Sequence, residues 1–412
     1  MIVPLREAPV MSPMSAKSAS AKPAFDAHDP LGIDDLLGDE DRAVRETMRS
    51  WAADRVLPHI ADWYERGELP GIRELARELG GLGALGMSLT GYGCAGAGAV
   101  QYGLVCLELE AADSGIRSLV SVQGSLAMYA IHRFGSEEQK NTWLPRMAAG
   151  EVIGCFGLTE PDHGSDPGGM RTYAKRDGSD WVLTGRKMWI TNGSVAGVAV
   201  VWARTDEGIR GFVVPTDSPG FSAPEMRHKW SLRASVTSEL VLDGVRLPAD
   251  AALPEAVGLG GPLSCLSHAR YGIVWGAMGA ARSCFESALG YAKEREQFGK
   301  PLAGFQLTQA KLADMAVELH KGILLAHHLG TRMDAGRLRP EQVSFGKLNN
   351  TREAIEICRT ARTILGANGI SLEYPVMRHA TNLESVLTYE GTVEMHQLVL
   401  GKALTGQDAF RG

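Results

Sequence analysis

The apolar pattern of this 412-residue chain changes twice along its length, and these changes constrain the fold more than any other feature. Residues 41–150 place apolar side chains at helical spacing, whereas residues 152–247 consist of short β-rich runs punctuated by Gly, Pro, Asp and Asn. Helical spacing then returns from Leu263 onward. In this last part we expect helical segments around 265–297, 304–335, 340–365 and 376–406. A chain of this length is too long to fold around one ordinary hydrophobic core, so we expect two or three subdomains. The sequence of helical, β-rich and helical segments predicts an α+β protein.

Shorter patterns refine this outline. The run Ser136-Glu137-Glu138-Gln139 is typical of a capped helix start, and the runs 198–202 and 211–214 are typical of strands. Residues 81–86 fit the spacing GxGxxG, but a dinucleotide-binding loop follows a strand, and the preceding residues 71–79 have a helical pattern. We therefore interpret these glycines as a helix end.

Composition excludes several classes of protein. The hydrophobic content of 44% and charged content of 22% are ordinary for a globular protein. No apolar run approaches the ~20 residues that span a bilayer, so we expect no membrane insertion. A net charge of −6 argues against binding along a nucleic-acid backbone. The six cysteines form no CxxC pair and the eleven histidines show no metal-binding spacing. We expect no metal, and we interpret four histidines as packing or surface residues: His132, His268, His379 and His396.

Residues 1–24 are rich in Ala, Ser, Met and Pro and lack the apolar core of a secretory signal. They hold few basic residues and no amphipathic repeat, which favours a disordered bacterial leader, although a weak transit peptide stays open. Scattered cysteines are typical of reduced thiols. We therefore expect a cytoplasmic protein in a bacterium, or a mitochondrial matrix protein in a eukaryote.

The tetrapeptide Tyr389-Glu390-Gly391-Thr392 interrupts a helix-forming run near the end of the chain. A glycine inside a helix costs roughly 1 kcal/mol, so its presence suggests that the backbone approaches a ligand closely. The glutamate beside it is a candidate general base. A loop between two helices with a solvated glutamate is the alternative interpretation.

Other motifs accompany this tetrapeptide upstream. They are Thr159-Glu160-Pro161, Gly164-Ser165-Asp166, Trp189-Ile190-Thr191-Asn192 and Arg295-Glu296-Gln297-Phe298-Gly299. Together these motifs resemble the acyl-CoA dehydrogenase family of flavoproteins, over nearly the whole chain from about Phe25. The resemblance implies an N-terminal α domain at 25–150, a small middle β barrel at 151–255 and a C-terminal four-helix bundle at 256–412. It also implies FAD as cofactor, a homotetramer, and an electron-transfer flavoprotein as the acceptor of electrons.

The resemblance also implies which residues contact FAD. On the isoalloxazine side they are Phe156, Leu158, Thr159, Ser165, Trp189, Ile190 and Thr191. Thr392 contacts a phosphate, and Glu394 is a further cofactor-binding residue. From a neighbouring subunit they are Arg295, Phe298 and Gln306, with Leu365, Gly366 and Ala367 in a segment that usually carries two glycines. Short side chains and backbone N–H groups on turns suit a flavin, because they stabilise charge on its ring.

The chemistry implied by the resemblance is α,β-dehydrogenation of an acyl-CoA thioester, with Glu390 removing the α-proton and Gly391 letting the ligand pack against the backbone. A glutamate has an ordinary pKa of about 4.3, so we expect desolvation to raise the pKa of Glu390.

Arg117 makes the chain resemble the glutaryl-CoA dehydrogenases within this family. A buried arginine in an acyl pocket is costly unless paired, and the distal carboxylate of a dicarboxylic acyl chain would pair it. We expect Glu110, seven residues earlier and on the same helical face, to hold the guanidinium. Other residues expected to bind substrate are Ser118, Ser165, Arg270, Tyr389 and Gly391. The resemblance then implies oxidation with decarboxylation to crotonyl-CoA, as in lysine and tryptophan degradation.

Three alternatives stay open at this stage. Arg117 could be a surface residue at a helix start. The enzyme could be a short- or branched-chain acyl-CoA dehydrogenase that does not decarboxylate. Relatives of this fold also act in nucleic-acid binding or assembly, but such roles would be favoured by a missing base or a basic extension, and Glu390 is present.

Overall fold

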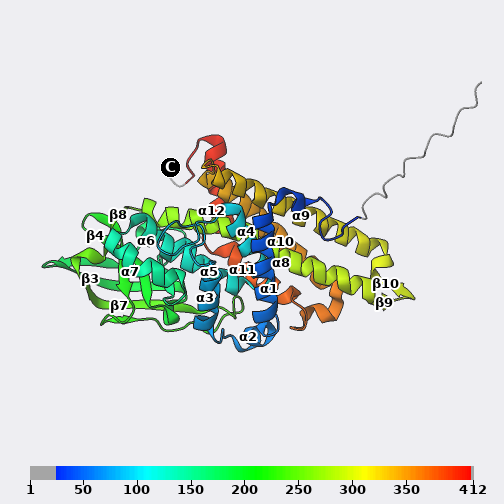
Figure 1. The fold of residues 1–412 in the computed structure, drawn as a ribbon, viewed down its shortest axis with the longest axis horizontal. Helices are drawn as coiled ribbons and strands as arrows, with labels where there is room; N and C mark the ends of the chain where they lie inside the picture. The colour runs from blue at the N-terminus through cyan, green and yellow to red at the C-terminus, as the bar shows by residue number, and fades with distance from the viewer. Residues whose placement is uncertain (1–24, 410–412) are drawn as a thin grey trace, which may run out of the picture.

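A computed structural model describes residues 25–409, with the large β-sheet at one end, a short hairpin at the other, and helices over most of the rest (Figure 1). The leader expected at 1–24 lies outside the described residues and stays a prediction. The order of helices, sheet and helices along the chain confirms the predicted α+β class.

The N-terminal part is helical, as its apolar spacing predicts. It comprises α1 (Asp39–Arg55), α2 (Ile60–Arg66), α3 (Ile72–Gly81), α4 (Ala99–Ala112), α5 (Ser114–Ser121), a π-helical turn η2 (Val122–Met128), α6 (Tyr129–Phe134) and α7 (Glu137–Ala148). The predicted cap of α7 is confirmed, because Gln139 N donates to Ser136 Oγ at 3.2 Å and Ser136 N to Gln139 Oε1 at 2.9 Å. Helix α3 runs to Gly81, so a helix precedes the glycine motif, as the interpretation requires.

The middle part is a sheet of eight strands. They are β1 (Gly154–Gly157), β2 (Tyr173–Asp177), β3 (Asp180–Thr191), β4 (Val198–Thr205), β5 (Gly208–Pro215), β6 (Phe221–Ser222), β7 (Thr237–Leu247) and β8 (Ala252–Val257). The pairing order is β6-β7-β3-β2-β4-β5-β8, with β1 parallel to β4. Among the described residues the ends of this order are β6 and β8. The predicted strand runs 198–202 and 211–214 lie in β4 and β5.

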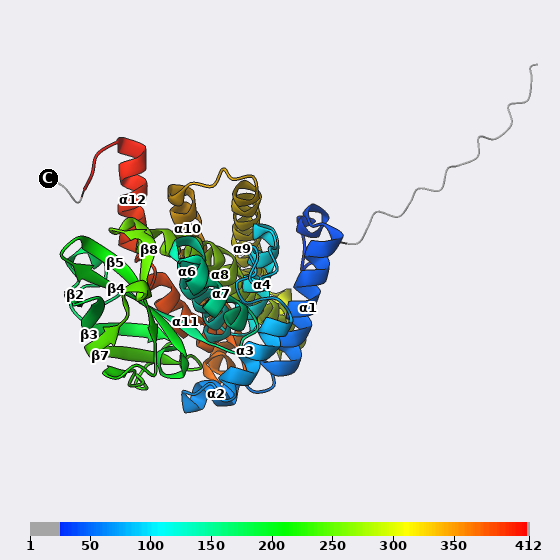
Figure 2. The same ribbon diagram turned by 60° about the vertical axis from the view of Figure 1, so that its left-hand side comes forward.

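The C-terminal part contains α8 (Gly260–Glu294), α9 (Gln306–Asp334), α10 (Pro340–Leu365), α11 (Val376–Thr388) and α12 (Val393–Thr405), with a hairpin of β9 (Glu296–Gln297) and β10 (Lys300–Pro301) after α8. Helices α8 to α11 pack together as the expected bundle. The expectation of one helical segment at 376–406 is wrong, because residues 389–392 separate α11 from α12. Helix α12 extends away from the bundle (Figure 2).

Helices α4 and α8 approach closely because α8 carries glycines where they meet. A Cβ on Gly279 would lie 2.0 Å from the backbone oxygen of Leu107, and a Cβ on Gly276 would lie 2.0 Å from Glu110 Oε2. A larger residue at either position would force the two helices apart. This contact brings the end of α4 against the bundle, where the candidate site lies.

Candidate active site

The break between α11 and α12 holds Glu390 in a strained backbone conformation. Its φ is 52°, in the left-handed region, and the φ of Gly391 is 100°. A non-glycine residue in this region costs of order 1–3 kcal/mol, and such strain is concentrated at functional sites. Thr392 then caps α12, where its Oγ1 accepts a hydrogen bond from Met395 N at 3.3 Å. Packing within the protein also favours glycine at position 391, because a Cβ there would lie 3.0 Å from His396 Nε2.

The carboxyl group of Glu390 is poised to accept a proton. Its Oε2 is buried and has no hydrogen-bond partner among the described residues. Burial raises the pKa of Glu390, and the positive charges of Arg117, Lys347 and Arg270 oppose that rise. The alternative interpretation of Glu390 as a solvated loop residue is therefore wrong.

Arg117 is buried, with 1% of its surface exposed, so its interpretation as a surface residue is wrong. Its Nε donates to Glu110 Oε2 at 2.6 Å, and its Nη2 donates to the hydroxyl of Tyr389, directly before Glu390. The predicted pairing with Glu110 is confirmed, although its stated reason is wrong. The two residues lie on different helices, α4 and α5, because the backbone is extended at Asp113.

A second buried ion pair, which sequence reasoning missed, fixes the start of α5. Asp113 Oδ1 accepts from Gly115 N at 2.7 Å, and its Oδ2 accepts from Arg378 Nη1 at 2.5 Å and from Asn382 Nδ2 at 2.9 Å. Arg378 and Asn382 belong to α11, which leads to Glu390. The network therefore ties the helix that carries Arg117 to the helix that precedes the candidate base. Ser118, the residue after Arg117, is buried there as well.

Two other residues near Glu390 contact its turn. Arg270 on α8, which is predicted to bind substrate, donates from Nε to the backbone oxygen of Glu390 at 2.6 Å. Lys347 on α10 donates from Nζ to the backbone oxygens of Tyr389 at 2.8 Å and Gly391 at 2.7 Å. Sequence reasoning missed Lys347, although a lysine on the apolar stripe of a helix was an available signal.

The predicted flavin residues of the middle part lie close to one another at the end of β3. Phe156 and Leu158 are buried. Met188 N donates to the backbone oxygen of Thr159 at 2.8 Å, and this hydrogen bond joins residues 156–159 to the end of β3. Next to it, Trp189 is 59% exposed and has a φ of 62°. Ile190 is buried, Thr191 is half-buried and Ser165 is exposed. A large exposed indole held by a strained backbone is suited to cover a planar ring.

A buried ion pair holds this arrangement together. Lys187 on β3 donates to Glu160 Oε1 at 2.8 Å and to the backbone oxygen of Leu158 at 3.1 Å. Glu160 also accepts from Arg171 N at 2.6 Å and Thr172 N at 2.9 Å. Although burial opposes it, these hydrogen bonds and Lys187 lower the pKa of Glu160 to about 2, whereas burial lowers the pKa of Lys187 to about 8.

We expect Lys187→Met to destabilise the protein by about 3 kcal/mol, because it leaves the buried Glu160 without its cation. The pKa of Glu160 is depressed in the folded protein, so its contribution is present above pH ~4.5 and is lost as the pH falls toward 2. Urea unfolding at pH 7 and pH 3 measures both effects. An equal stability of variant and wild type at pH 7 would contradict this account of the pair.

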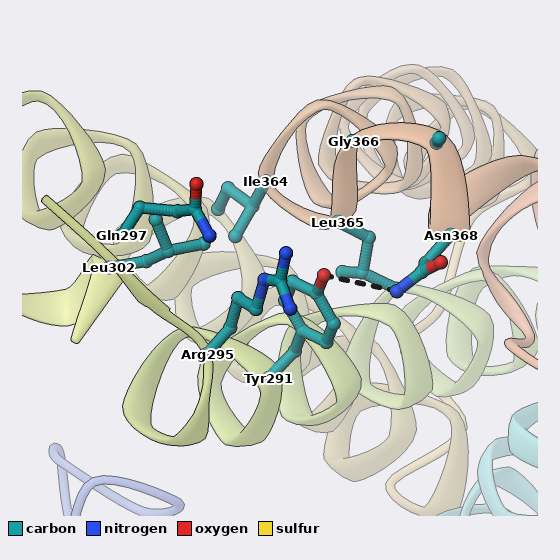
Figure 3. Close-up of a pocket in the computed structure, with 9 residues that line it drawn as sticks. Tyr291, Arg295, Gln297, Leu302, Ile364, Leu365, Gly366 and Asn368 are labelled. Carbon is teal, nitrogen blue, oxygen red and sulfur yellow. Dashed lines mark hydrogen bonds between the residues drawn. The ribbon is translucent and has the colours of Figure 1, made fainter.

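A second group of expected cofactor residues lies at the far end of α8. Arg295, Leu365, Gly366 and Ala367 line one cavity of about 260 Å³ together with Tyr291, Gln297, Leu302, Ile364 and Asn368 (Figure 3). Asn368 Nδ2 donates to the Tyr291 hydroxyl at 3.1 Å. Phe298 is 95% exposed and Gln306 is exposed, both near the β9–β10 hairpin.

The two groups of expected cofactor residues do not meet within one chain. Arg270 near Glu390 and Arg295 at the cavity are separated by 25 residues of α8 and its end, or about 38 Å at ~1.5 Å per residue. Thr392 and the exposed Glu394 lie with Glu390. One cofactor molecule therefore cannot contact both groups in the same chain.

Among residues 25–409, no group of three His, Cys, Asp or Glu residues could hold a metal ion. His396 is 2% exposed, which confirms its interpretation as a packing residue, and the six cysteines are unpaired. No helix between residues 25 and 409 is both long and apolar enough for a membrane span.

Comparisons with known proteins match most of the chain to one family. The family models for the acyl-CoA dehydrogenase N-terminal, middle and C-terminal domains match residues 38–151, 155–245 and 257–405. A glutaryl-CoA dehydrogenase from Mycobacterium smegmatis is similar at 72% identity and a TM-score of 0.93, covering 94% of this chain and 100% of that chain. A second structure from M. smegmatis, a glutaryl-CoA dehydrogenase in complex with FADH2, is 63% identical with a TM-score of 0.92 and the same coverage. The mitochondrial short-chain specific acyl-CoA dehydrogenase of Bos taurus is 34% identical, covering 88% of this chain and 90% of its own length.

Proposed function

The chain belongs to the acyl-CoA dehydrogenase family of FAD enzymes, and from this premise we propose that it oxidises glutaryl-CoA with loss of CO₂ to give crotonyl-CoA. The observation that carries the proposal is the buried Arg117 beside Glu390, held by Glu110 and by the Tyr389 hydroxyl. A positive group in a desolvated acyl site recognises a second carboxylate. The name of the 72% identical M. smegmatis protein supports the same substrate.

Charge in the site supports a dicarboxylic substrate. Three cationic residues, Arg117, Arg270 and Lys347, interact with two carboxylates, Glu110 and Glu390. When Lys347 is protonated, one positive charge is left over, and a distal carboxylate would neutralise it. The sequence analysis expected the distal carboxylate of the substrate to pair with Arg117, but Glu110 already forms that pair. The distal carboxylate instead balances the summed charge of the three cationic residues and two carboxylates.

The residues of this chain supply acid–base chemistry. FAD, when bound, supplies the acceptor for two electrons and the β-hydrogen of the substrate. Glu390, with its raised pKa, removes the α-proton, so that a double bond forms between the α and β carbons. The bond to the distal carboxylate then breaks and CO₂ leaves, and its electron pair is delocalised toward the thioester. The protonated Glu390 returns a proton to the carbon chain, which gives crotonyl-CoA.

We assign the flavin ring to the end of β3, where the exposed Trp189 would cover it and Phe156, Leu158, Thr159, Ser165, Ile190 and Thr191 would hold it. Thr392 would contact its phosphates, and Glu394 would be a further contact. The distance of about 38 Å to the cavity at Arg295 supports an oligomer in which that cavity serves the cofactor of a neighbouring subunit, and the homotetramer rests on the family. An electron-transfer flavoprotein as acceptor and a cytoplasmic or matrix location rest on the family alone.

We expect the purified protein to be yellow and to carry FAD. Arg295→Ala should lower the FAD content, because the guanidinium is the cation that lines the distal cavity and would pair with the pyrophosphate. Absorbance at the flavin maximum and equilibrium dialysis of FAD measure both. A colourless protein that cannot be reconstituted would overturn the enzyme assignment, and full FAD affinity in Arg295→Ala would remove the cavity from the cofactor site.

A short- or branched-chain acyl-CoA dehydrogenase without decarboxylation is the second candidate. It is favoured by the existing pairing of Arg117 with Glu110, which would let an uncharged acyl chain occupy the site. The specificity constants kcat/KM for glutaryl-CoA and butyryl-CoA with an artificial electron acceptor separate the candidates. A clear preference for glutaryl-CoA supports our proposal, and a preference for butyryl-CoA supports the alternative.

A further inference from the structure

Three consecutive backbone carbonyls of the turn at Glu390 accept hydrogen bonds from cationic side chains. The oxygens of residues 389 and 391 accept from Lys347 Nζ at 2.8 and 2.7 Å, and the oxygen of Glu390 itself accepts from Arg270 Nε at 2.6 Å. Charge-assisted hydrogen bonds of this kind are stronger than neutral ones. The turn is thus held from α10 on both sides of the base and from α8 at the base.

Lys347 has no surface role. It is 1% exposed on α10, and it makes no ion pair with a carboxylate among the described residues. A buried ammonium group is costly unless its hydrogen bonds are made, and the two carbonyls that flank Glu390 receive them. The turn itself is strained at Glu390, where φ is 52°, so it persists only when surrounding groups hold it.

We propose that Lys347 is a positioning residue for Glu390, whose ammonium group holds the strained turn and keeps the carboxylate aimed into the acyl site in its ionised form. This inference rests on the proposed role of Glu390 as base and adds a residue to that site. Lys347 acts through the turn and through its charge, and it does not contact the reacting carbons in this account.

The charge effect has a definite sign. Burial raises the pKa of Glu390, and Lys347 is one of three cations that lower it, so removal of its charge raises that pKa further. Lys347 titrates as well, since burial lowers its pKa to about 7 while Glu390 opposes that shift. Other titratable or charged groups face the turn from α4, α5, α8, α12 and the turn itself. They are Cys106, Glu110, Arg117, Arg270, His396 and Tyr389.

The test compares Lys347→Met with a matched change one turn later on α10. Asn350 is also fully buried, but its amide donates to the oxygens of Val274 at 2.8 Å and Gly322 at 2.9 Å, away from the turn. Two quantities are measured in the FAD-loaded proteins. The first is the rate of anaerobic flavin reduction by glutaryl-CoA as a function of pH, and the second is amide hydrogen exchange of residues 389–396 without substrate.

We expect Lys347→Met to move the acid limb of the rate profile upward by about one pH unit, to slow reduction at pH 7 about tenfold or more, and to speed exchange of the turn. Asn350→Ala should lower thermal stability but leave the midpoint unchanged. Lys347→Gln keeps donors without charge, so it should raise the midpoint with less effect on exchange, and it serves where the Met variant does not fold.

Wild-type midpoint and exchange in the Lys347 variants, or an equal midpoint shift in Asn350→Ala, would overturn the proposal. Glu390→Gln separates this failure from failure of the proposed function. If Glu390→Gln reduces flavin at the wild-type rate, the base is elsewhere. If it is inactive while Lys347→Met keeps the wild-type profile, Glu390 stands as base and only the role of Lys347 is lost.

Discussion

Replacement of Glu390 by Gln is expected to slow flavin reduction by acyl-CoA about 10²- to 10⁴-fold, the range that a general base contributes. The amide keeps the size of the side chain but cannot accept the α-proton. Because Glu390 Oε2 has no hydrogen-bond partner among the described residues, the change breaks no contact of that atom. Stopped-flow absorbance of the flavin measures the effect directly.

The pH dependence of the rate of flavin reduction in the wild type is a second test of Glu390. The base acts only when ionised, so the rate should rise with pH through a midpoint above the ordinary pKa of a glutamate, because burial raises the pKa of Glu390. FAD content and acyl-CoA binding should be unchanged in Glu390→Gln. A variant with near-normal rates of reduction would place the base elsewhere.

Replacement of Arg117 by Gln is expected to lower kcat/KM for glutaryl-CoA about 30- to 4,000-fold more than for butyryl-CoA. Loss of a desolvated charge partner costs roughly 2–5 kcal/mol, and only glutaryl-CoA has the distal carboxylate. Arg117 also lowers the pKa of Glu390. That effect applies to both thioesters, so the ratio of the two specificity constants is the measurement that isolates the carboxylate.

Two further variants separate recognition from folding. Arg117→Gln leaves Glu110 as an unpaired buried charge, so the double variant with Glu110→Gln tests whether stability returns while the preference for glutaryl-CoA stays lost. Arg282→Gln is the matched control, since Arg282 is paired with the buried Glu108 at 2.6 and 2.7 Å. It should affect both thioesters alike. A parallel loss for both in Arg117→Gln would make that arginine structural.

The order of helices and strands could be predicted because burial repeats along the chain with the period of each element. The cap at Ser136 and the strands β4 and β5 follow from short local patterns. The break at 389–392 is marked in the sequence by Gly391 alone, because the residues on both sides form helices.

The motifs that predict the active site also indicate where the backbone adopts a strained conformation. Four of the six non-glycine residues with positive φ among the described residues lie in the motifs named above: Trp189, Asn192, Phe298 and Glu390. Motifs thus marked where the backbone is strained. They did not reveal the buried supports, such as Lys347 and the pair of Asp113 with Arg378, because these partners lie far apart in sequence and meet only in the folded chain.

Product analysis after a single turnover tests the central claim most directly. The enzyme is mixed anaerobically with glutaryl-CoA in which the distal carboxylate is labelled with ¹³C, and the products are identified by mass spectrometry. Our account predicts crotonyl-CoA and labelled CO₂ in equal amounts, with one reduced flavin for each. An unsaturated dicarboxylic acyl-CoA that retains the label, or no reduction by glutaryl-CoA alongside rapid reduction by butyryl-CoA, would contradict it.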